Sequence, residues 1–195
     1  MARASYVQNV ANGKVKVWGK KQVRMQKQKG FSLIELLIVV AIILVIAAIA
    51  IPNLLRARMA ANDSSAAASV RNINTAEIAY SGAFPSIGYP AALTTLGGAD
   101  PCTPSMTTAC LIDNSLASNG GGNGKSGYNF NAVGSASPSS LSNDQFFATG
   151  VPFGTTTGTR SYCSVQDAVV RLQPAGTITL VPSYTTCLTL APMGN

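Results

Sequence analysis

The clearest pattern in the chain is a long apolar run, FSLIELLIVVAIILVIAAIAI, at residues 31–51. A helix of this length spans roughly 30 Å, which matches the hydrocarbon core of a membrane. Its fifteen Phe, Leu, Ile and Val residues favour insertion by about 5 to 9 kcal/mol in total. The one charged residue, Glu35, opposes insertion by at most about 3.5 kcal/mol. The run therefore predicts a membrane-spanning helix.

A second helical pattern follows the run, beyond Pro52. Residues 53–80 contain no Gly or Pro and are rich in Ala, so we expect Pro52 to kink the helix or loosen its preceding turn without ending it. A continuous helix over residues 31–80 would be about 75 Å long. The stripe expected to face a globular domain recurs at three- and four-residue spacing and comprises Val70, Ile73, Ala76, Glu77 and Tyr80.

The remaining chain has the composition of strands and loops. Gly82, Pro85, Gly88 and Pro90 end the helical pattern. Short apolar runs then predict strands at residues 127–133, 145–151, 160–172 and 177–181, the last two joined by a hairpin turn at 173–176. The Gly-rich segment 118–125 predicts a flexible loop, and its lack of strand-to-helix context argues against a phosphate cradle.

These patterns predict an α+β fold in which a long N-terminal helix packs on an antiparallel sheet. Its first half spans a membrane and its second half is amphipathic. The expected organisation is a basic leader at residues 1–30, a transmembrane or filament-core helix at 31–52, an amphipathic helix at 53–82 and an exported β-rich domain at 83–195. Met25 begins a complete six-residue leader by itself, so translation is hypothesised to start there.

Charge is distributed very unevenly. The net charge is +7, but 8 of the 14 Lys and Arg residues and none of the 7 acids precede Phe31, so the rest of the chain is nearly neutral. Basic residues before an apolar run remain on the cytoplasmic side, so the C-terminal part should be exported. No basic cluster with interleaved aromatic residues follows, and nucleic-acid binding has no specific support.

The residues available for chemistry favour a structural role. The chain contains no His, which removes the commonest general base and zinc ligand. No spacing indicates a catalytic site, and no metal or cofactor is expected; a pair such as Asp144 and Asp167 is better explained by turns. Four Cys residues, an even number, lie in the exported part and indicate disulfides.

The segment that carries most information is Lys29-Gly30-Phe31-Ser32-Leu33-Ile34-Glu35, followed by the apolar run and Pro52. It resembles the N-terminal signature of type IV pilins and pseudopilins. The resemblance is specific over residues 25 to about 55 and looser to Tyr80.

The resemblance implies a function in filament assembly. A prepilin peptidase would cleave between Gly30 and Phe31 and methylate the new amine of Phe31. Gly30 suits a scissile position because it lacks a side chain. Glu35 would pair with the Phe31 amine of a neighbouring subunit. Further partners implied are other copies of the chain, the membrane, an assembly ATPase and an inner-membrane platform protein.

The four cysteines allow three connectivities. Nearness in sequence favours Cys102 with Cys110 and Cys163 with Cys187, and the resemblance adds that pilins often close a C-terminal loop in this way.

Three alternatives remain open. Ala48-Ile49-Ala50 resembles a signal-peptidase site, and cleavage after Ala50 would leave a mature chain starting at Ile51. Glu35 and the length of the run argue against it. A type II secretion pseudopilin is the alternative within the superfamily, although calcium ligation by C-terminal acids is poorly supported because Asp167 is the last acid. An anchored exported enzyme is the third. The expected location is the inner membrane as a single-pass precursor, then an extracellular pilus or a periplasmic pseudopilus.

Overall fold

The computed structural model describes residues 30–194, so residues 1–29 of the predicted leader, with the hypothesised start at Met25, lie outside the described residues. The chain divides into two units, the first ending at Ile43 and the second beginning at Leu44. In chain order the elements are α1 (Leu33–Ala83), two short 3-10 turns at Leu93–Leu96 and Gly120–Gly122 with α2 (Asn114–Ala117) between them, β1 (Tyr128–Ser135), β2 (Gln145–Pro152), β3 (Tyr162–Val165), β4 (Arg171–Leu172), α3 (Tyr184–Thr189) and β5 (Ala191–Pro192).

The start of α1 is fixed by its own side chains. The backbone N–H of Ser32 donates to Oε2 of Glu35 at 3.0 Å, which is the Glu half of an S-x-x-E capping box. Leu33 is therefore the first helical residue, and Phe31 lies outside the helix. The expectation that the helix begins at Phe31 was wrong by two residues, because this cap defines the end. The helix then continues through Pro52, as expected.

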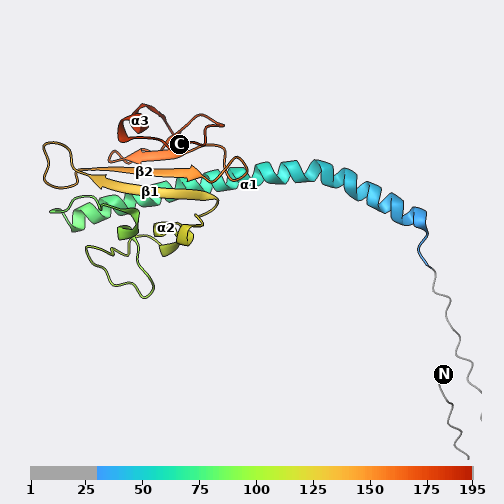
Figure 1. The fold of residues 1–195 in the computed structure, drawn as a ribbon, viewed down its shortest axis with the longest axis horizontal. Coiled ribbons are helices and arrows are strands. Elements are labelled where there is room, and N and C mark those ends of the chain that lie inside the picture. The colour runs from blue at the N-terminus through green and yellow to red at the C-terminus, as the bar shows by residue number, and fades with distance from the viewer. Residues whose placement is uncertain (1–29, 195) are drawn as a thin grey trace, which may run out of the picture. The chain divides into compact units, whose positions relative to one another are not determined.

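The second half of α1 packs on the sheet of the globular part, as Figure 1 shows. The predicted stripe is confirmed, since all five of its members are buried: Val70, Ile73, Ala76, Glu77 and Tyr80. Small Ala66 and Ala67, also fully buried, let the backbone of the helix approach the strands. A Cβ added to Gly150 of β2 would lie 3.4 Å from Cγ2 of Val70.

The sheet is antiparallel throughout, with the strand order β1-β2-β3-β4-β5. Burial alternates along β1: Tyr128, Phe130 and Ala132 are buried against the helix, while Asn129 and Asn131 on the other face are exposed. This alternation gives an inner face that packs on α1 and an outer face. The predicted α+β fold is confirmed.

Asp63 of α1 joins the helix to the region beside the sheet. Its carboxylate accepts hydrogen bonds from the backbone N–H of Thr159 at 3.0 Å and from the hydroxyls of Thr159 and Tyr128. Burial and the bond to Asp63 raise the pKa of Tyr128 well above its usual range, so the phenol remains a donor. This cluster fixes the rotation of α1 relative to β1.

The C-terminal third differs from the predicted strands. The segment 160–172 forms two strands, β3 and β4, because the chain turns between them at Gln166 and Asp167. The predicted strand at 177–181 is wrong. Gly176 and Thr177 pair with Thr159 and Ser161 at one bond each, and the chain then leaves to cover the outer face, so that β5 pairs with β4 instead.

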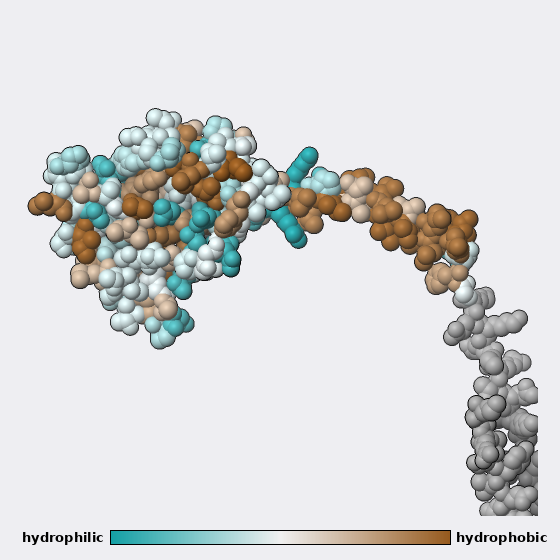
Figure 2. All heavy atoms as spheres, viewed as in Figure 1, coloured by the Kyte–Doolittle hydropathy of each residue, from teal (hydrophilic) through white to brown (hydrophobic). Residues whose placement is uncertain are grey.

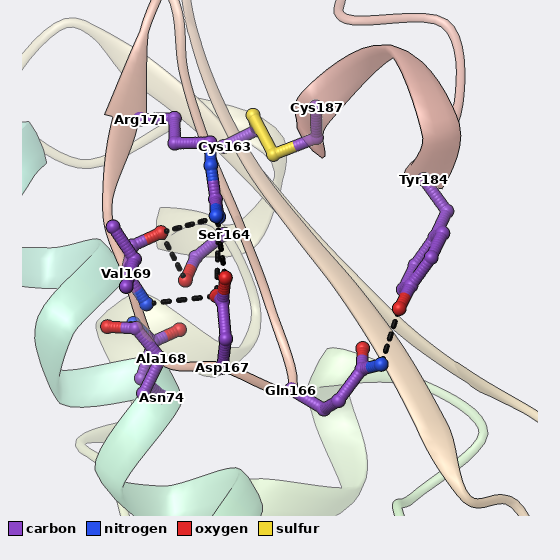
Figure 3. Close-up of polar contacts among 10 residues, drawn as sticks. All are labelled: Asn74, Cys163, Ser164, Gln166, Asp167, Ala168, Val169, Arg171, Tyr184 and Cys187. Carbon is purple, nitrogen blue, oxygen red and sulfur yellow. Dashed lines mark hydrogen bonds and ion pairs between the residues drawn. A yellow bond between two sulfur atoms is a disulfide. The ribbon is translucent and has the colours of Figure 1, made fainter. Parts of the chain in front are cut away.

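A second, smaller core lies on this outer face. Cys163, Val165, Val181 and Cys187 are fully buried there, and the Cys163–Cys187 disulfide joins β3 to α3 (Figure 3). The other bridge joins Cys102 to Cys110. These are the two pairs that nearness in sequence favoured.

We expect loss of the Cys163–Cys187 bridge to destabilise the globular part more than loss of Cys102–Cys110. The first bridge closes a loop of 24 residues and the second one of 8, and the chain-entropy cost rises with loop length. Replacing both cysteines of each pair by Ala should cost roughly 3 to 4 kcal/mol and 2 to 3 kcal/mol respectively. Urea unfolding of the full chain in nonionic detergent checks this. The reverse order would contradict it.

Candidate functional site

The first part of α1 presents apolar side chains on all sides. All fifteen Phe, Leu, Ile and Val side chains of residues 31–51 are exposed, each by 46% or more. Figure 2 shows this stretch as continuous hydrophobic surface. Within residues 30–194, α1 is the helix that is long and apolar enough to cross a membrane. Isolated exposed apolar residues need no explanation, but a contiguous surface of this size indicates burial in a membrane or in an assembly.

Glu35 carries the single charge of this apolar surface. One carboxylate oxygen accepts from the Ser32 backbone at 3.0 Å, and a carboxylate can accept several further bonds. The side chain therefore both caps the helix and keeps acceptor capacity for a cation. Inference from the sequence alone missed the capping role, although the S-x-x-E pattern was there to reveal it.

Gly30 and Phe31 lie just before the helix. Both are exposed and outside any regular element, and a Cβ added to Gly30 would have no heavy atom within 4 Å. The Gly30–Phe31 peptide bond therefore lies outside the helical hydrogen-bond ladder. Because Phe31 precedes the cap, a cationic amine formed there would be close in sequence to Glu35 but not stacked one helical turn above it.

Pro52 lies inside α1 and is exposed. It cannot donate a backbone hydrogen bond, so the carbonyl of Ala48 lacks its helical partner. Arg56 and Arg58, also exposed, are the first charges after Glu35 and mark the end of the apolar surface. The residues singled out from the sequence therefore fall into one continuous stretch of the chain, with the four cysteines elsewhere in the globular part.

The globular part offers polar contacts that serve the fold. Figure 3 shows a typical set, in which Asp167 accepts from Arg171 and from the backbone N–H of Val169. The Arg171 guanidinium holds the pKa of Asp167 below its usual range. Among residues 30–194, no group of three or more His, Cys, Asp or Glu could hold a metal ion.

The fold and the N-terminal segment define a class of protein: a β-rich domain carried on a single long helix whose first half is apolar. Residues 25–51 match the family model described as the prokaryotic N-terminal methylation motif. A 40-residue stretch is 65% identical to the "Type IV wide pilus major component PilA4" of Thermus thermophilus. It covers 20% of this chain and 30% of that relative. No solved structure matches the chain.

Over its N-terminal segment this chain is therefore similar to a type IV pilus component, and its long helix packed on an antiparallel sheet is consistent with a pilin fold. The similarity to the pilus component spans about a third of that protein's length. The similarity to known proteins therefore rests on the N-terminal segment.

Proposed function

We propose that this chain is the structural subunit of a type IV pilus-like filament and assembles through the first half of α1. The observation that carries the proposal is the exposed apolar surface of residues 31–51, interrupted by the single carboxylate of Glu35. Exposing such a surface to water is unfavourable by about 25 cal/mol for each Å² of apolar area. The helix belongs first in a bilayer and then in the core of a filament.

Processing between Gly30 and Phe31 allows the helix to move from the bilayer into the filament core. A prepilin peptidase removes the leader, methylates the Phe31 amine and takes away every basic residue that precedes Phe31. The exposed, non-helical peptide bond at this position supports the proposal, as does the motif match at residues 25–51. A start of translation at Met25, the first residue of that match, fits the same processing. The precursor is a single-pass inner-membrane protein with its N-terminus in the cytoplasm.

The contact between Glu35 and a neighbour's Phe31 amine would determine register. Lipid tails are as apolar as Leu, so moving α1 from the bilayer into a filament core gains little hydrophobic free energy. An ion pair in that core selects one register, because a register that leaves the charge of Glu35 unpaired is costly. Extraction from the bilayer requires work, which we assign to a cytoplasmic ATPase acting through an inner-membrane platform protein. The role is structural and involves no catalysis or cofactor.

The test is the intact mass and N-terminal residue of the protein in filaments sheared from the cell surface. We expect abundant fibres whose subunits begin with N-methylated Phe31 and contain two disulfides. Subunits that begin at Ile51 would refute the proposal in favour of a conventional signal peptide cleaved after Ala50. Correctly processed protein that is absent from surface fibres would instead assign the chain to a periplasmic pseudopilus.

A further inference from the structure

The loop between β1 and β2, residues 136–144, carries one fully exposed apolar side chain, Leu141. Leu141 is fully exposed, more so than any other large apolar residue among residues 30–194. Leu at such a position is not required by the loop, whose neighbours are Ser, Pro, Asn and Asp. The other residues of the loop are small or polar, so Leu141 is its single large apolar side chain.

Hydrogen bonds hold this loop in one conformation. Asp144 accepts from the backbone N–H and the hydroxyl of Ser137 at 2.7 and 2.6 Å. Asn143 is bound to the segment after α1: its side chain donates to the carbonyl of Tyr89, and its own carbonyl accepts from the Tyr89 N–H, both at 2.8 Å. Ordering the loop in advance reduces the entropy that a contact by Leu141 would cost.

A groove of about 330 Å³ lies toward the other end of the same hairpin. Its apolar lining comes mainly from Val151, Phe153 and Leu180, with Asn129 and Asn131 beside them. Phe153 is 53% exposed and Leu180 is 59% exposed. No charged residue lines the groove, so its lining suits an apolar side chain.

The groove exists because the outer face of the sheet is only partly covered. The C-terminal segment packs on β2 and β3 through Val181 and Cys187, and it leaves the outer face of β1 open. Gly124 lies against Phe153, one of the residues that line the groove. A Cβ at this residue would lie 2.1 Å from Cε2 of Phe153, so only a glycine lets the ring lie there.

Strand addition is hindered at the edge of β1. Several of its outward backbone groups are already bonded: Tyr128 with Lys125, Phe130 with the side-chain amide of Asn119, and the N–H of Gly134 with Pro90. At the opposite edge, Pro192 removes a donor from the short β5. We therefore expect contacts between globular parts to use side chains.

We propose that Leu141 of one subunit inserts into the groove lined by Val151, Phe153 and Leu180 of another copy of this chain. The tip and the groove lie on different surfaces, toward opposite ends of one hairpin, so the contact is heterologous and continues from copy to copy without closing. This is the symmetry that a filament requires. The inference rests on the proposed function, because one side chain in one groove is too small a contact to associate free subunits.

Reciprocal charge substitution tests the contact in intact filaments. Leu141→Asp and Leu180→Lys each place a charge in the proposed apolar contact, and neither disturbs the fold because both side chains are exposed. We expect each single variant to reduce the yield of sheared filaments at least fivefold. The double variant, which brings the two charges together, should recover at least half of the wild-type yield. Leu188→Asp is the matched control, since Leu188 is 44% exposed on α3 and lies outside the groove.

A photo-crosslinking amino acid at position 141 gives a second, independent readout. Capture of a neighbouring subunit at the peptide that contains Phe153 or Leu180 supports the contact. The contact is overturned if the probe captures another surface, captures a different protein, or captures nothing. It is also overturned if Leu141→Asp gives wild-type yields, or if the double variant yields no more filaments than the single variants. In each of these cases, filaments whose subunits begin at Phe31 leave the proposed function standing. If wild-type cells make no such filaments, both proposals fall.

Discussion

Glu35→Leu should leave the protein in the membrane and reduce the yield of filaments by at least about a hundredfold. In the bilayer, replacing a carboxylate by Leu makes insertion more favourable by a few kcal/mol. In the proposed filament, the same change would leave the neighbour's Phe31 amine without its counter-ion in an apolar core. Removing one partner of a buried ion pair costs about 3 to 5 kcal/mol, which is a factor of 10² to 10³ in an equilibrium constant. Membrane fractionation and quantitation of sheared filaments measure the two effects separately.

Two controls distinguish the ion pair from the helix cap. Ser32→Ala retains the backbone N–H that donates to Glu35 and should assemble normally. Glu35→Gln retains an oxygen that can accept this bond, but has no charge, so it should fail to assemble as Glu35→Leu does. If Glu35→Gln assembles at the wild-type level, capping and not charge is the function of this residue. Wild-type filament yields from Glu35→Leu would contradict both roles.

The helix was predictable because two simple rules determine it. Composition alone places residues 31–51 in an apolar environment, and three- and four-residue spacing identifies the face that carries Val70 and Tyr80. The start at Leu33 was missed because the cap depends on one side-chain bond, between Glu35 and Ser32. A single local bond moves a boundary by two residues without changing the period of the pattern.

The arrangement of the C-terminal part was harder to predict because tertiary contacts decide it. Thr177–Val181 has the alternation of a strand, but the Cys163–Cys187 bridge and the small core around Val181 draw this segment over the outer face. The Gly-rich segment 118–125 makes a contact that its composition did not predict. Asn119, at φ +50°, forms two bonds with Phe130 at the edge of β1. Neither outcome leaves a periodic signal in the sequence.

Glu77 was placed on the buried face by its spacing, but spacing does not indicate which groups surround a buried side chain. The side chain is fully buried, and neither carboxylate oxygen has a hydrogen-bond partner within the described part of the chain. The titratable groups close to it are Tyr80 and Tyr89, whose pKa values are raised by burial and then by the charge of Glu77. Burial raises the pKa of Glu77 to about 8.

The globular part should therefore lose stability as the pH rises from about 5 to 8. A carboxyl group with a raised pKa holds its proton in the folded state at a pH where the unfolded state has released it. Over this window the folded protein binds more protons, so the free energy of unfolding falls with pH. The loss is on the order of 3 kcal/mol by pH 7.5, given that each pKa unit is worth about 1.4 kcal/mol. Few other groups compete, because the chain has no His.

Glu77→Met should remove most of this pH dependence and raise the unfolding midpoint above pH 7. Met has a similar volume and no polar atom to leave unpaired, whereas Glu77→Gln removes the charge but retains an unbonded amide, so its gain should be smaller. Urea unfolding of the full chain in nonionic detergent, at intervals between pH 5 and 8.5, measures both effects.

Asp113, whose pKa is lowered to about 2 by the hydrogen bonds from Lys125 and Ser115, gives the control. Asp113→Asn should affect stability equally at pH 5 and pH 8, because its carboxyl is ionised throughout this range. A pH profile of Glu77→Met that parallels the wild type would show that Glu77 is not the group responsible.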